Sequence, residues 1–65
     1  MMSFEEAKDW LANNMPELNS ELWPMDFNQV RIRMNQETGL DINAIDSIPD
    51  TFPKYIEVLK AANNL

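Results

Sequence analysis

The 65-residue sequence has no cysteine, no histidine and only one glycine. Without cysteine there is no disulfide framework, and without either cysteine or histidine the usual ligands of a zinc site are missing. Chains without disulfides are typical of reducing compartments, so the expected localisation is cytoplasmic. A single glycine together with four prolines favours helices joined by short turns over a strand-rich domain.

The sequence is also poor in cations and has no long apolar run. Five lysines and arginines stand against eleven aspartates and glutamates, so the formal net charge is -6. An anionic protein has few cations with which to displace the counterions of a phosphate backbone, so direct nucleic-acid binding is not expected. No run approaches the roughly 18 apolar residues of a membrane span, so no membrane partner is expected either. The expected partner is another protein, and a basic one would suit the charge.

The chain does have enough apolar material for one small core. Hydrophobic residues make up 45% of it, including two tryptophans and three phenylalanines. Residues 1–65 are expected to form a single small helical domain, which buries only about 60% of its extended surface. Because such a small core gains stability from a neighbour, a homo-oligomer or a structural subunit of a larger assembly is one alternative.

The first helix is predicted by a capping box. Ser3 is followed three residues later by Glu6, so each side chain can accept from the other residue's backbone N–H at the helix start. Proline inside a helix removes an amide donor and clashes with the preceding turn, so this helix should end before Pro16. Together these signals predict a helix over about residues 4–14.

A second capping box opens the central helix. It pairs Asp26 with Gln29, and Gly39 is suited to the left-handed position that ends such a helix. These signals predict a helix over about residues 27–38. A competing interpretation is a half-buried strand, because residues 30–34 alternate apolar and polar side chains.

The other elements are bounded by weaker signals. Residues 16–23 form either a short helix with proline in its first turn or an ordered loop. Residues 40–49, with isoleucines three apart, are expected to supply one or two short helical turns. The last helix should cover about residues 52–63, capped by Asp50 or Thr51. The predicted fold is therefore all-α, a small bundle of three main helices with one or two short helical turns.

Three aspartates, Asp41, Asp46 and Asp50, could suggest a site for a hard metal ion. A calcium loop starting at Asp41 fails, because its sixth position is Asp46 instead of glycine and its twelfth is Phe52 instead of a bidentate glutamate. These acids are better explained as caps and turn residues. No phosphate loop, nucleophile elbow or Cys-His pair is present, so neither catalysis nor a bound metal is expected.

Within the central helix, two faces differ in their expected role. Phe27, Val30 and Met34 share the face that should pack on the core, whereas Ile32 projects from roughly the opposite side. One interpretation is that residues 16–23 cover Ile32 and that the neighbouring arginines are merely solvated. The other is that this side of the helix is a docking surface.

In the docking interpretation, apolar anchors are edged by arginine, as is common in protein interfaces. Its predicted residues are Trp23, Met25, Arg31, Ile32 and Arg33. A second surface, on which acids would engage a basic partner, is predicted at Glu5, Glu6, Asp9, Glu17 and Glu21. A protein with such a surface would act as an inhibitor that imitates the charge of a nucleic acid. The predicted function is that of a small acidic adaptor or inhibitor with no catalysis of its own.

Over residues 25–59 the chain carries spaced apolar residues, a Glu-x-Gly-Leu-x-Ile ending and an apolar last helix. The residues of this pattern are Met25, Val30, Met34, Glu37, Gly39, Leu40, Ile42, Phe52, Tyr55, Ile56 and Leu59. The pattern resembles acyl and peptidyl carrier proteins, and the resemblance implies a small helical bundle. Pro24 stands where that family has the serine that bears phosphopantetheine, so no cofactor is expected.

Overall fold

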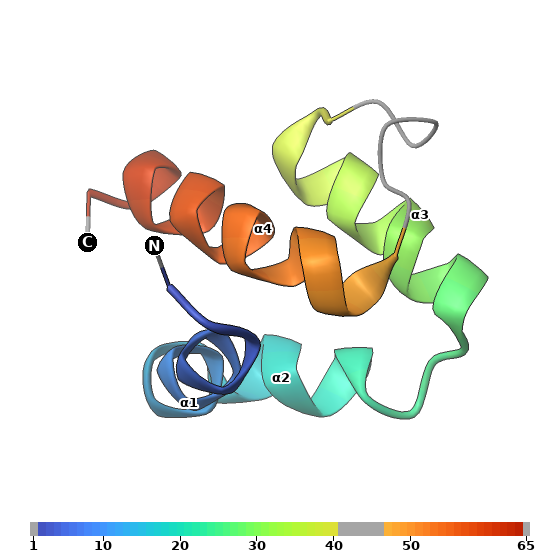
Figure 1. Ribbon diagram of the computed structural model, residues 1–65, viewed down its shortest axis with the longest axis horizontal. Coiled ribbons are helices and arrows are strands. Elements are labelled where there is room, and N and C mark those ends of the chain that lie inside the picture. Colours follow the sequence, from blue (N-terminus) through green and yellow to red (C-terminus); the bar gives the residue numbers. More distant parts are fainter. Residues whose placement is uncertain (1, 41–46, 65) are drawn as a thin grey trace.

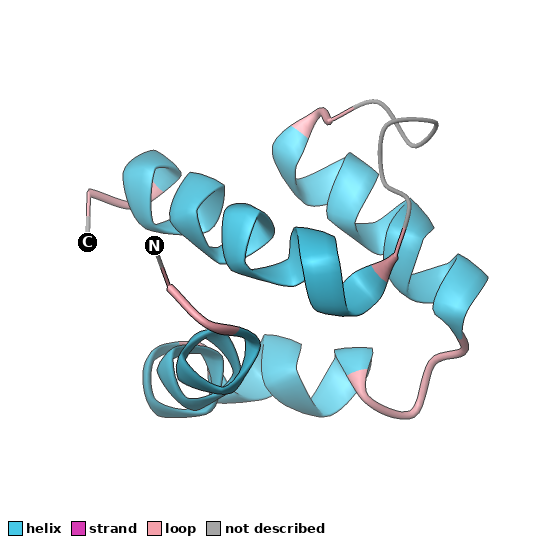
Figure 2. Ribbon diagram, in the orientation of Figure 1, coloured by secondary structure: helices cyan, strands magenta, loops and turns pink. Residues whose placement is uncertain are grey.

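Four helices make up most of the chain in the computed structural model, in which residues 2–40 and 47–64 are described. In chain order they are α1 (Phe4–Asn14), α2 (Pro16–Leu22), α3 (Phe27–Thr38) and α4 (Ile48–Ala62). The described part of the chain contains no strand, and short loops join α1 to α2 and α2 to α3 (Figure 2). The all-α prediction is therefore confirmed.

Helix α4 is the centre of the arrangement, because both α1 and α3 pack against it while α2 packs against α1. Figure 1 shows α4 across the middle, with α3 on one side and α1 and α2 on the other. The radius of gyration is 10.7 Å, which matches the value expected for a compact chain of this length. The molecule is thus a small compact helical domain.

The predicted starts of α1 and α3 are confirmed in atomic detail. The N–H of Glu6 donates to Ser3 Oγ at 3.1 Å, and the N–H of Ser3 donates to Glu6 Oε1 at 3.3 Å. The same reciprocal pair joins Asp26 and Gln29, with distances of 2.9 and 3.3 Å. At the end of α3, Gly39 has a left-handed φ of 74°, and its N–H bonds back to the last turn. The strand interpretation of residues 30–34 is therefore wrong.

The segment left open between helix and loop, residues 16–23, is helical up to Leu22. Pro16 occupies the first turn of α2, where its missing N–H would have no intrahelical partner in any case. Leu18 and Leu22 are four residues apart, lie on one side of α2, and are both buried. The apolar pair holds this short helix on the core.

The predicted start of the last helix is wrong by four residues. Helix α4 begins at Ile48, not at residue 52, so Ile48 and Pro49 belong to it and not to a separate helical turn. Proline fits here because the first turn of a helix needs no amide donors. Residues 41–46 of the predicted connector, which begin the rejected calcium loop, lie outside the described residues.

The predicted caps of α4 are also displaced. Ser47 precedes the helix, and its hydroxyl donates to the Asp50 carboxylate at 2.7 Å. Asp50 therefore lies within the first turn, where a carboxylate suits the positive end of the helix dipole. Pro53 lies inside the helix and is buried. Burial of its ring on the core offsets the amide donor that it lacks.

The core is formed by apolar side chains from all four helices. Its buried members are Ala7, Leu11, Leu18, Leu22, Val30, Met34, Phe52, Tyr55, Ile56 and Leu59. Phe52 lies among three other aromatic rings, with centroid distances of 5.5 Å to Phe4, 5.2 Å to Trp23 and 6.0 Å to Tyr55. Each of α1 and α4 thus packs through one apolar face.

Phe27 is an exception to the predicted core face. Its side chain is 40% exposed, although Val30 and Met34 on the same face are buried. Phe27 is the first residue of α3, and Figure 1 shows this end of the helix projecting beyond the start of α4. The ring lies on the expected side of the helix but beyond the part that α4 covers.

Candidate protein-binding surface

Helix α3 presents its least covered side to the solvent around Ile32. Successive residues of a helix are about 100° apart, so Ile32 lies about 160° from both Val30 and Met34. Those two side chains are buried, whereas Ile32 is 47% exposed. The interpretation in which residues 16–23 cover Ile32 is therefore wrong.

Five residues form a continuous strip over about half of the circumference of α3. In order around the helix they are Phe27, Arg31, Asn28, Ile32 and Gln36, and we call this strip the α3 surface. Within residues 2–40 and 47–64, Phe27 and Ile32 are the large apolar side chains that remain exposed. The strip therefore joins the two exposed apolar groups through polar neighbours.

Arg31 lies against the exposed ring of Phe27. Its guanidinium carbon is 5.3 Å from the ring centroid, within the range of a cation–π contact. The two residues are four apart, as neighbours on one side of a helix are. The pair places an aromatic ring and a guanidinium side by side at the start of α3.

The charge of the α3 surface differs from that of the whole molecule. Residues 27–36 contain no aspartate or glutamate, although the net charge of the chain is -6, and Arg31 is the charged residue of the strip. The exposed polar groups of the α3 surface are the amides of Asn28 and Gln36. The strip therefore has no acidic side chain of its own on an acidic protein.

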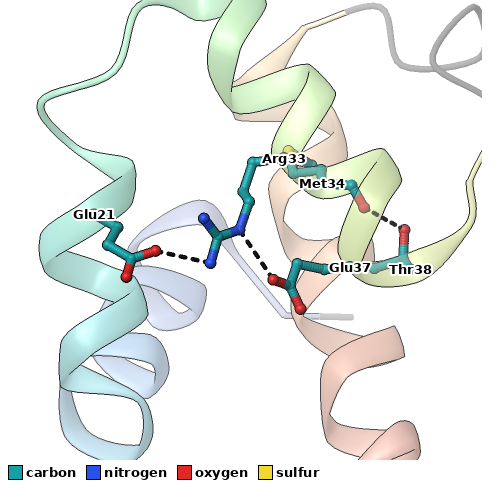
Figure 3. A network of polar contacts seen from close by, with 5 residues as sticks. All are labelled: Glu21, Arg33, Met34, Glu37 and Thr38. Carbon is teal, nitrogen blue, oxygen red and sulfur yellow. Dashed lines mark hydrogen bonds and ion pairs between the residues drawn. The ribbon is translucent and has the colours of Figure 1, made fainter.

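Arg33 points away from the α3 surface, toward α2. Its Nη2 lies 2.7 Å from Glu21 of α2, and its Nε lies 2.9 Å from Glu37 one turn along α3 (Figure 3). The hydrogen bond to Glu37 raises the pKa of the guanidinium above its usual value. Arg33 therefore ties α3 to α2 and does not edge an apolar patch.

Trp23 and Met25, the other predicted docking residues, pack against the core. The ring of Trp23 contacts Phe52, and its indole N–H donates to Asn19. Lys8 Nζ lies 5.0 Å from the centroid of the same indole. Of the five predicted residues, the structure thus brings only Arg31 and Ile32 onto one exposed strip.

Phe27 is the member of the strip that sequence reasoning assigned to the core. Its position three residues before Val30 gives it the periodicity of a core residue. The available signal was its place directly after the Asp26 cap, since a residue at a helix end often lies beyond the packed part of the helix.

The predicted acidic surface consists of side chains that are exposed. Its residues Glu5, Glu6, Asp9, Glu17 and Glu21 all lie on α1 and α2. These two helices carry five carboxylates and a single cation, Lys8. The carboxylates therefore dominate the charge that a partner meets on these helices.

A pocket of about 480 Å³ lies where the end of α1, α2 and α3 meet. Its lining residues are Asn14, Met15, Pro16, Glu17, Leu18, Glu21, Arg33 and Glu37. The Arg33 ion pairs described above belong to its wall. The pocket thus lies on the flank of α3 where Arg33 projects.

One buried hydroxyl group is affected by the charges of the pocket wall. Tyr55 is fully buried, and its hydroxyl forms no hydrogen bond with any described residue. Burial raises the pKa of the hydroxyl above its ordinary value; the Glu37 carboxylate acts in the same direction, and the Arg33 guanidinium opposes it. The hydroxyl therefore experiences the field of the charged pair in the pocket wall.

The described residues contain neither a cluster of metal ligands nor a membrane-spanning helix. No three or more aspartates or glutamates lie together there in a way that could hold a metal ion. Among the same residues, no helix has the length and apolar character needed to cross a membrane.

No protein-family model matches this chain, and no curated protein or solved structure is significantly similar to it. No family assignment therefore supports the resemblance to carrier proteins. What the structure shows is an all-helical domain with four helices in the described residues.

Proposed function

We propose that this protein is a small acidic protein-binding module, an adaptor or inhibitor without catalysis of its own, that docks through the α3 surface. The observation that carries the proposal is the 47% exposure of Ile32 in the middle of a strip free of acidic side chains. Isolated exposed apolar residues are ordinary. Here Ile32 shares its strip with an exposed phenylalanine and a stacked arginine, which are residue types enriched in interfaces.

The partner that fits is a protein with an apolar docking groove inside a basic surface. The groove would receive Ile32 and Phe27, while the basic surroundings would meet the exposed acids of α1 and α2. Electrostatic complementarity of this kind mainly raises the association rate, whereas buried apolar anchors supply most of the affinity. The proposed setting is the cytoplasm.

Replacing Ile32 with aspartate tests the docking surface. We expect binding to weaken by at least about thirtyfold, since an interface anchor contributes about 2 kcal/mol or more and the new charge would be buried. Stability should change by less than about 1 kcal/mol, because the side chain is half exposed in the monomer. Crosslinking and quantitative mass spectrometry would first identify proteins captured by the unchanged chain, and titration calorimetry with each purified candidate would then measure affinity.

Ala12→Asp is the matched control for this experiment. Ala12 is exposed on α1, so the substitution adds the same charge to a helix remote from the α3 surface. Equal binding by the unchanged chain and the Ile32→Asp variant, with equal melting temperatures, would exclude the α3 surface. Binding that survives Ile32→Asp but disappears at high salt would instead favour the acidic surface of α1 and α2.

The alternative function is that of a structural or self-associating subunit. A second copy placed on the α3 surface would cover the same apolar groups, but each copy carries a formal charge of -6. Mutual repulsion of that size opposes association. Sedimentation of the purified protein therefore also tests the proposal. If the protein forms a concentration-dependent dimer that Ile32→Asp abolishes, the partner of the α3 surface is a second copy of this chain.

The resemblance to carrier proteins is proposed to extend to the arrangement of helices alone. Pro24 lies in the turn before α3 and has no hydroxyl to which phosphopantetheine could be attached. Incubation with coenzyme A and a broad-specificity phosphopantetheinyl transferase should leave the intact mass unchanged, while an authentic carrier protein in the same tube gains the group. A mass increase on this chain would show that a serine elsewhere is used.

A further inference from the structure

The pocket between α2 and α3 has two chemically different walls. Met15, Pro16 and Leu18 supply its apolar part, at the junction of α1 and α2. Charged side chains supply the rest, with Glu17 and Glu21 from α2 opposite Arg33 and Glu37 from α3. An occupant with an aliphatic stem and a polar head would match both walls.

The negative charge of the pocket favours an occupant whose polar head is positively charged. Three carboxylates face one guanidinium, which leaves a formal charge of -2. Arg33 is bound by Glu21 and Glu37, whereas Glu17 forms no ion pair or hydrogen bond with any described residue. The uncompensated carboxylate and the second oxygens of the paired ones would accept hydrogen bonds from a cation.

The buried Tyr55 hydroxyl lies outside the lining of the pocket. It is fully buried without a hydrogen-bond partner among the described residues, and such groups are rare in folded proteins. The charges that act on it are those of Glu37 and Arg33 in the pocket wall. A cation bound at Glu37 would therefore also change the electrostatic environment of this hydroxyl.

We propose that this pocket receives a lysine or arginine side chain of the partner protein. The inference rests on the proposed function and deepens it by naming the residue that the basic partner would insert. The aliphatic stem would lie on Met15, Pro16 and Leu18, and the cationic head would meet the carboxylates. Because Arg33 follows Ile32 in sequence and lies about 100° further around α3, one partner could occupy the α3 surface and the pocket together.

A blocked amino acid is a sufficient probe, so the test does not require the partner. N-acetyl-arginine methylamide and N-acetyl-lysine methylamide would be titrated into 15N-labelled protein and followed by amide chemical shifts. N-acetyl-norleucine methylamide is the matched control, because it keeps an aliphatic stem and lacks the charge. We expect saturable shifts, with a dissociation constant on the order of millimolar for so small a ligand, centred on residues 14–21 and 33–37.

Variants separate specific binding from general attraction to an acidic protein. Glu17→Gln should weaken binding of the arginine probe by about two- to fivefold, the range of an exposed ion pair. Glu57→Gln removes an exposed carboxylate on α4, outside the pocket, and should leave the affinity unchanged.

Three results would overturn the proposal: equal shifts with the norleucine probe, shifts spread over every acidic residue, or equal weakening by Glu17→Gln and Glu57→Gln. The outcomes remain separable from those for the proposed function. If the arginine probe fails while Ile32→Asp still abolishes partner binding, the docking surface stands and the pocket assignment falls. If the probe binds while Ile32→Asp has no effect, the pocket assignment stands without the α3 surface.

Discussion

Replacing Phe52 with alanine is expected to leave most of the protein unfolded at physiological temperature. Phe52 is fully buried, and its ring lies among those of Phe4, Trp23 and Tyr55. Truncating a buried phenylalanine costs about 3–5 kcal/mol. A domain of this length has a total stability of only about 3–10 kcal/mol at the usual stability per residue. The loss is therefore comparable with everything that holds the fold together.

Urea denaturation followed by circular dichroism would measure the loss, and Phe27→Ala is its matched control. Phe27 is the same residue type, but it is 40% exposed and lies at the end of α3. Its truncation should reduce stability by less than about 1 kcal/mol. Equal losses at the two positions would mean that the aromatic cluster around Phe52 is not the centre of the core.

Raising the pH above about 10 is expected to destabilise the protein through one side chain, the buried hydroxyl of Tyr55. An exposed tyrosine ionises near pH 10, and burial raises the pKa of Tyr55 in the folded state. Between those two values the unfolded chain has lost a proton that the folded chain keeps. The unfolded state therefore binds fewer protons, and the free energy of unfolding falls as pH rises, with a slope of up to about 1.4 kcal/mol per pH unit.

The chain offers a clean measurement of this effect, because Tyr55 is its single tyrosine. Ultraviolet absorbance would report its ionisation directly, and urea denaturation at each pH would report stability. In Tyr55→Phe the added slope should disappear. Near neutral pH the same variant should be as stable as the unchanged chain or slightly more stable, since no hydrogen bond to a described residue is lost. Ionisation near pH 10 in the folded protein would contradict the expected burial.

The parts of the fold that the sequence predicts well are those set by local interactions. The capping boxes at Ser3 and Asp26 and the left-handed Gly39 involve residues within one turn of one another. Their chemistry is complete within the segment, so the ranges of α1 and α3 follow from it. Helix α4 differs, because its first turn has no side chain that caps the backbone. Its earlier start depends on burial of the apolar face that begins at Ile48.

In the candidate site, too, only the features set by local sequence could be predicted. Helical periodicity alone placed Ile32 opposite Val30 and Met34. Whether Ile32 is exposed depended on where α2 packs, and α2 packs on α1 and leaves Ile32 uncovered. The ion pairs of Arg33 could not be anticipated either, since Glu21 comes within 2.7 Å only after α2 and α3 are placed by the core.

The placement of the cations also decides how the chain meets a protease. Trypsin cleaves after lysine and arginine, and it needs the surrounding backbone to be extended. Every such residue of this chain lies inside a helix: Lys8 in α1, Arg31 and Arg33 in α3, and Lys54 and Lys60 in α4. Cleavage thus requires a helix to open, and when opening and closing are fast the digestion rate tracks the population of opened molecules. Trypsin digestion is thereby a label-free measure of helix opening in this protein.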